Sequence, residues 1–154
     1  MNNVFDLVAD FYGQDEEWNS VLRQSYVENF LRSKSWQGAE DKELTEYWDY
    51  ITLLCIYLGN SENFLGDMSK DDFIDCIAWC GRNVADFALT DKKVAKFLDV
   101  MDELYTHLHN KKIIMNCAAP SEAKAKLLPE GKLTLMDYEG NFLPECNKFN
   151  LYST

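Results

Sequence analysis

The chain has 154 residues, of which 47% are hydrophobic and 14% aromatic, so one folded domain needs neither disulfides nor metals to form a core. Its formal net charge is −11, and the excess lies between residues 1 and 75, where sixteen acidic residues accompany five basic ones. That charge repels phosphate backbones and argues against direct nucleic-acid binding, and no apolar run reaches the ~18 residues of a membrane span.

The cysteines indicate a reducing compartment. Their number is odd, and one of them lies within an apolar run, which fits buried thiols better than a disulfide framework. They are Cys55, Cys76, Cys80, Cys117 and Cys146. The first residues also lack the basic and apolar regions of a secretory signal. We therefore expect a cytoplasmic protein.

Apolar periodicity predicts two helices in the first 35 residues. The first spans Val4 to Tyr12 and ends at Gly13. The second runs from about Asp15 to Ser35, with acidic residues at its start, where the helix dipole favours negative charge. Its expected inward stripe consists of Trp18, Val21, Leu22, Ser25, Tyr26 and Phe30.

The third predicted helix has the strongest pattern. In the segment KELTEYWDYITLLCIYLGN, apolar residues recur every three or four positions, and the second half is apolar almost all round. We expect this helix to be central to the bundle. Gly59 and Asn60 supply its C-terminal stop.

Two further helices are predicted between residues 69 and 110. Ser69 followed by Asp72 matches a capping box, and the apolar positions after it continue to Ala88. Thr90 or Asp91 caps the fifth helix, which carries apolar residues to Leu108. The short connection between the two helices predicts an antiparallel pair.

The pattern of apolar residues changes after Asn110. Pro120 begins a predicted brief helix that ends before Pro129. The segment LPEGKLTLMDYEGNFLPE then alternates and breaks at Glu139-Gly140-Asn141, which predicts a small β-hairpin. We thus expect an all-α, single-domain bundle of about five helices over residues 1–112. A C-terminal extension, residues 113–154, would pack its short helix and hairpin on that bundle.

The sequence contains none of the common catalytic motifs. Its closest glycines, Gly59 and Gly66, are too far apart for a phosphate-binding loop, and His107 and His109 have the wrong spacing for HExxH. Cys76 and Cys80 share one helical face, but they supply at most half of a zinc site. Two small buried thiols are the simpler interpretation, and we expect neither a metal nor a cofactor.

An enzyme or small-ligand-binding protein is the alternative function. It would use an interhelical pocket near His107, with Glu103 one helical turn before it and Cys80 as further candidates. A structural carboxylate–imidazole pair is the simpler interpretation of Glu103 and His107.

The leading hypothesis is a non-enzymatic interaction or regulatory module with a basic protein partner. An acidic cluster covers the linker and the start of the third helix, and it consists of Glu40, Asp41, Glu43, Glu46 and Asp49. Helical spacing aligns the last three on one side, away from Trp48 and Ile51. A solvated surface that aids solubility is the competing interpretation of this cluster.

Overall fold

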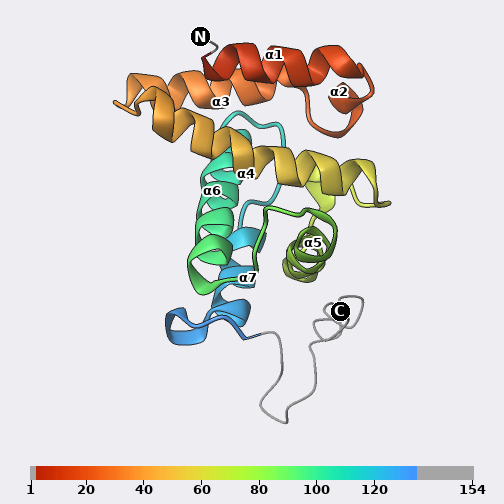
Figure 1. The fold of residues 1–154 in the computed structure, drawn as a ribbon, viewed down its shortest axis with the longest axis vertical. Coiled ribbons are helices and arrows are strands. Elements are labelled where there is room, and N and C mark those ends of the chain that lie inside the picture. Colours follow the sequence, from red (N-terminus) through yellow and green to blue (C-terminus); the bar gives the residue numbers. More distant parts are fainter. Residues whose placement is uncertain (1–2, 135–154) are drawn as a thin grey trace. The chain divides into compact units, whose positions relative to one another are not determined.

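A computed structural model describes residues 3–134, and all regular structure in that range is helical (Figure 1). The α-helices are α1 (Val4–Gln14), α2 (Trp18–Val21), α3 (Gln24–Trp36), α4 (Asp41–Gly59), α5 (Lys70–Asn83), α6 (Asp91–Asn110) and α7 (Ala119–Leu127). Two short 3-10 helices, Leu65–Asp67 and Pro129–Gly131, complete the described elements. The predicted all-α class is confirmed, whereas the count of about five helices is wrong.

The chain divides into two compact units. The first is Met1–Leu65, and the second begins at Gly66. The boundary that the sequence predicts after residue 112 has no test in the structure and stays a prediction.

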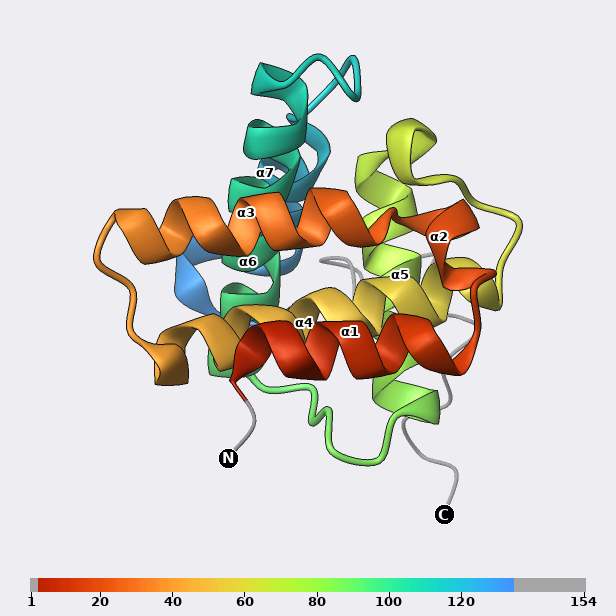
Figure 2. The same ribbon diagram turned by 90° about the horizontal axis from the view of Figure 1, so that it is seen from above.

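Helix α4 is the centre of the first unit. Helices α1, α2 and α3 each pack against it, and α1 also packs against α3 (Figure 2). The core between them is apolar and includes Val8, Val27, Phe30, Leu31, Leu44, Trp48, Ile51 and Leu54. The broad apolar surface of this helix therefore has the central role that its sequence predicts.

The predicted second helix is broken into α2 and α3. Leu22 is extended (φ −157°, ψ 115°), and its carbonyl accepts a hydrogen bond from the Tyr12 hydroxyl at 2.5 Å. The Asn19 side chain then accepts a hydrogen bond from the backbone N–H of Gln24 at 2.9 Å, at the start of α3. The break has a tertiary cause. Tyr12 belongs to α1, and its hydroxyl bonds a carbonyl that would accept a backbone hydrogen bond in a continuous helix.

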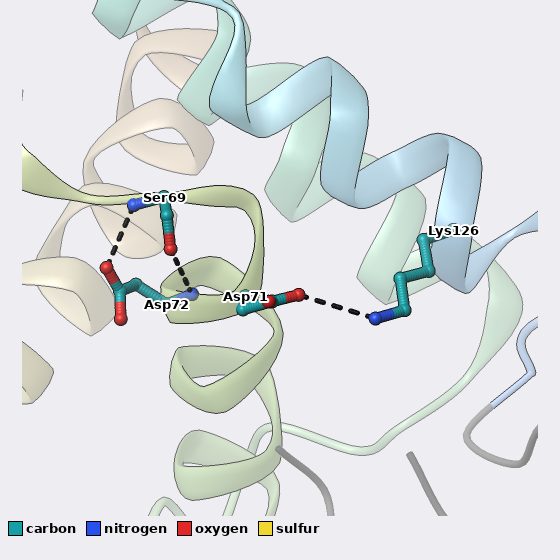
Figure 3. Close-up of polar contacts among 4 residues, drawn as sticks. All are labelled: Ser69, Asp71, Asp72 and Lys126. Carbon is teal, nitrogen blue, oxygen red and sulfur yellow. Dashed lines mark hydrogen bonds and ion pairs between the residues drawn. The ribbon is translucent and has the colours of Figure 1, made fainter. Parts of the chain in front are cut away.

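The second unit is held together by α7, which packs against both α5 and α6. Lys124 forms an ion pair with Asp99 of α6 at 2.6 Å. Lys126 forms an ion pair with Asp71 of α5 at 3.3 Å, which Figure 3 shows. The aromatic rings of Phe73 and Tyr105 meet edge to face, 5.1 Å between centroids, and join α5 to α6. Helix α7 therefore links α5 to α6 by contacting both, and the antiparallel arrangement predicted for α5 and α6 stays a prediction.

Helix α5 ends five residues earlier than the apolar pattern predicts. It stops at Asn83, and Val84 is extended. The returning chain lies directly over Gly81, where an added Cβ would come within 2.6 Å of Leu89 Cγ. Because glycine has no Cβ, the chain that follows α5 can pack against the helix at this point. This packing takes the place of the further helical turn that the sequence predicts.

The predicted β-hairpin is not seen. Its first residues, 128–134, contain the 3-10 helix Pro129–Gly131 and no strand. Glu130 and Gly131 have positive φ values of 56° and 82°, which turn the chain instead of extending it. The rest of the predicted hairpin lies outside the described residues. Within the described range, no helix combines the length and apolar character needed to cross a membrane.

Candidate functional site

The acidic surface, which we define as Glu40, Asp41, Glu43, Glu46 and Asp49, lies on the first half of α4. All five side chains are exposed. Trp48 and Ile51, between and beyond them in sequence, are buried on the inward side. The helical periodicity therefore places the carboxylates toward solvent, as their spacing predicts.

Helix capping explains only part of this surface. Asp41 and Glu43 occupy the first turn of α4, where the helix dipole favours them. Glu40 stands at the N-cap, but its side chain accepts no capping hydrogen bond. No ion pair within residues 3–134 involves Glu40, Asp41, Glu43 or Asp49. These carboxylates are therefore not neutralised by the described part of the chain.

At the C-terminal end of the acidic surface, burial and neighbouring carboxylates raise the pKa values of two groups. Partial burial raises the pKa of Asp49 above its ordinary value, and the Glu46 carboxylate one turn away raises it further. Burial also raises the pKa of the neighbouring Tyr50, with smaller effects from Glu46 and Asp49. A nearby cation would lower both pKa values and would be attracted to this surface.

An exposed tryptophan lies next to the acidic surface in the chain. Trp36, the last residue of α3, is 82% exposed. Gly38, with φ +104°, reverses the chain directly after it, and the backbone N–H of Ala39 donates to the Lys34 carbonyl at 3.0 Å. In the sequence, the signal of this residue is a large aromatic side chain in an otherwise polar segment.

The cysteine candidates are part of the core. Cys76 and Cys80 are fully buried on one face of α5 and hydrogen-bond each other. Burial, followed by that hydrogen bond, raises the pKa of Cys76 well above its ordinary value. A neutral, inaccessible thiol is a poor nucleophile, so this arrangement fits two small core residues.

Glu103 and His107 lie one turn apart on α6, and both are half-buried. Cys80 belongs to α5 and has no exposed surface. Within residues 3–134, no three His, Cys, Asp or Glu side chains gather closely enough to hold a metal ion. The expected absence of metal stays a prediction, as does any catalytic role of these three residues.

The first unit also contains a pocket that sequence reasoning missed. It has a volume of about 390 Å³ and lies between α2 and the C-terminal end of α4, with the segment Ser61–Leu65 along its side. His107, Glu103 and Cys80 do not line it. The break between α2 and α3 was not predicted, so the pocket beside α2 could not be predicted either.

The chain matches no protein-family profile, no curated protein and no solved structure.

Proposed function

We propose that the protein is a non-enzymatic interaction module that binds a basic protein partner through the acidic surface of α4. The observation that carries the proposal is that Glu40, Asp41, Glu43 and Asp49 are exposed and have no ion-pair partner within residues 3–134, while the exposed Trp36 lies four residues before Glu40. Solvation alone accounts for the exposed acids, and the exposed indole of Trp36, four residues before Glu40 in the chain, adds an apolar contact that a partner would cover.

The acidic surface and Trp36 contribute differently to such binding. Complementary charge accelerates and orients the encounter, and its effect decreases as salt screens it. Aromatic residues, tryptophan in particular, supply most of the affinity when a partner covers them. Trp36 would therefore act as the anchor, and the acidic surface would select a partner of positive charge.

The test compares two variants with the same change in net charge. The first carries Glu43→Gln, Glu46→Gln and Asp49→Asn in the acidic surface. The control carries Asp86→Asn, Glu122→Gln and Glu130→Gln, three exposed residues of the second unit. Tagged wild-type protein captures partners from the native host, mass spectrometry identifies them, and the purified partner is then titrated against each variant.

We expect the acidic-surface variant to associate about tenfold more slowly and to lose most of its salt dependence, while the control behaves as wild type. Trp36→Ala should chiefly accelerate dissociation. The proposal is wrong if both charge variants bind alike, or if the captured partners are acidic proteins.

A further inference from the structure

The pocket in the first unit, which we call the α2–α4 pocket, is independent of the acidic surface. Figure 2 shows α2 beside the C-terminal end of α4, and the two helices pack together. The acidic surface belongs to the N-terminal half of the same 19-residue helix, which is about 28 Å long. The volume of about 390 Å³ is in the range of small-molecule sites.

One wall of the pocket is fixed by packing. The Trp18 ring stacks on Phe11, 4.8 Å between centroids, and its other edge contacts the backbone of Gly59. An added Cβ at Gly59 would lie 2.7 Å from Trp18 Cζ3, so the glycine makes this contact possible. The indole is thus held in place before any ligand arrives, which lowers the entropic cost of binding.

A second part of the lining comes from the segment that follows α4. The Asn63 side chain donates a hydrogen bond to the Tyr57 hydroxyl at 2.7 Å, and this contact ties the segment to α4. Its neighbour Phe64 lines the pocket but is 71% exposed. The lining therefore includes an exposed aromatic ring on a segment that a hydrogen bond holds against α4.

The polar part of the pocket is negative. Asp15, Glu17 and Glu62 line it, and its lining contains no lysine, arginine or histidine. No ion pair in the described range engages any of these three carboxylates. Asp15 accepts a hydrogen bond from the Glu17 N–H at 2.9 Å, which fixes the rim at the start of α2.

We propose that the α2–α4 pocket binds a small organic cation, namely an ammonium ion with an apolar body. The apolar body would lie against Trp18 and Phe64, and the ammonium group would face the three carboxylates. Aromatic faces attract cations as well as apolar groups, so both kinds of lining favour the same ligand. Neutral and anionic molecules of the same shape lack the attraction of a positive charge to the carboxylates and to the aromatic faces.

The experiment follows the backbone amide signals of isotope-labelled, full-length protein by NMR. The probe is 2-phenylethylammonium, and the matched ligands are neutral 2-phenylethanol and anionic 3-phenylpropionate. We expect saturable shifts at Trp18, Gly59 and Phe64 with the cation, which should bind about tenfold more tightly than the alcohol. N-acetyl-arginine amide serves as a mimic of a partner protein's side chain.

The variant Glu17→Gln/Glu62→Gln should reduce the affinity for the cation about tenfold without changing that for the alcohol. Asp86→Asn/Glu122→Gln, which changes the net charge equally, should leave both affinities unchanged. Equal binding of the cation and the alcohol, or the same affinity in both double variants, overturns the proposal. So does binding of the arginine amide alone, which would assign the pocket to a partner's side chain. These readouts do not involve the acidic surface, so either proposal can fail without the other.

Discussion

Tyr12 is the residue whose side chain most directly shapes the backbone of the first unit. Its hydroxyl is buried, donates to the Leu22 carbonyl at 2.5 Å and lies 4.0 Å from Cys55 Sγ. Burial raises the pKa of Tyr12 far above its ordinary value and raises that of Cys55 to about 12. Both groups are therefore neutral at physiological pH, and the hydroxyl keeps the proton that it donates.

The variant Tyr12→Phe should lower the free energy of unfolding by about 1–3 kcal/mol. The ring would still fill its site, but the Leu22 carbonyl would be left buried without a partner. Chemical denaturation measures the effect. Tyr26→Phe is the matched control, because that side chain is only half-buried, and it should change stability by less than about 0.5 kcal/mol. Equal effects of the two variants would contradict the role given to the Tyr12 hydroxyl.

At the scale of the element, the starts of α5 and α6 follow local capping rules. Ser69 Oγ accepts from the Asp72 N–H at 3.1 Å, and the Asp72 carboxylate accepts from the Ser69 N–H at 2.9 Å (Figure 3). Thr90 caps α6 through the Lys93 N–H in the same manner. These caps were predictable because each one involves residues only three positions apart.

Replacement of Ser69 by alanine should destabilise the protein by about 1 kcal/mol, because the first turn of α5 loses an acceptor for one of its free N–H groups. Ser25→Ala is the control. Ser25 lies at the start of α3, is exposed and makes no side-chain capping bond, so its loss should cost less than about 0.5 kcal/mol. Thermal unfolding followed by circular dichroism compares the two, and a cost as large for Ser25 would exclude capping as the cause.

At the scale of the whole molecule, uneven charge opposes folding. The net charge of −11 arises entirely from the first 75 residues. Exposed ion pairs, such as Lys124–Asp99 and Lys126–Asp71 in the described part of the chain, each contribute little to stability. Self-repulsion of the carboxylates should therefore exceed the favourable ion-pair energy.

We accordingly expect the unfolding midpoint to rise when the ionic strength increases from a few millimolar to about 0.15 M. The Glu43→Gln, Glu46→Gln, Asp49→Asn variant should show a smaller rise, since less repulsion is left to screen. Differential scanning calorimetry at several concentrations of an inert salt provides the measurement. A midpoint that falls with salt would mean that favourable charge pairs outweigh the repulsion.

The sequence by itself determined the features that depend on neighbouring residues. Helical class, the apolar character of α4, the caps at Ser69 and Thr90 and the short helix after Pro120 all follow from patterns within a few turns. The spacing of Glu43, Glu46 and Asp49 likewise predicted a solvent-facing row on α4, although their partner stays a proposal.

Tertiary structure decided where regular elements stop. The hydrogen bond from Tyr12 to Leu22 breaks the predicted second helix, although Asn19 and Ser20, both poor helix formers, were an overlooked local signal. The packing of Leu89 over Gly81 ends α5 early. The α2–α4 pocket exists only because α2 is a separate helix beside Gly59. In each case, the residue that makes the contact is distant in sequence or lies beyond a chain reversal. The local periodicity of the sequence therefore does not predict the contact.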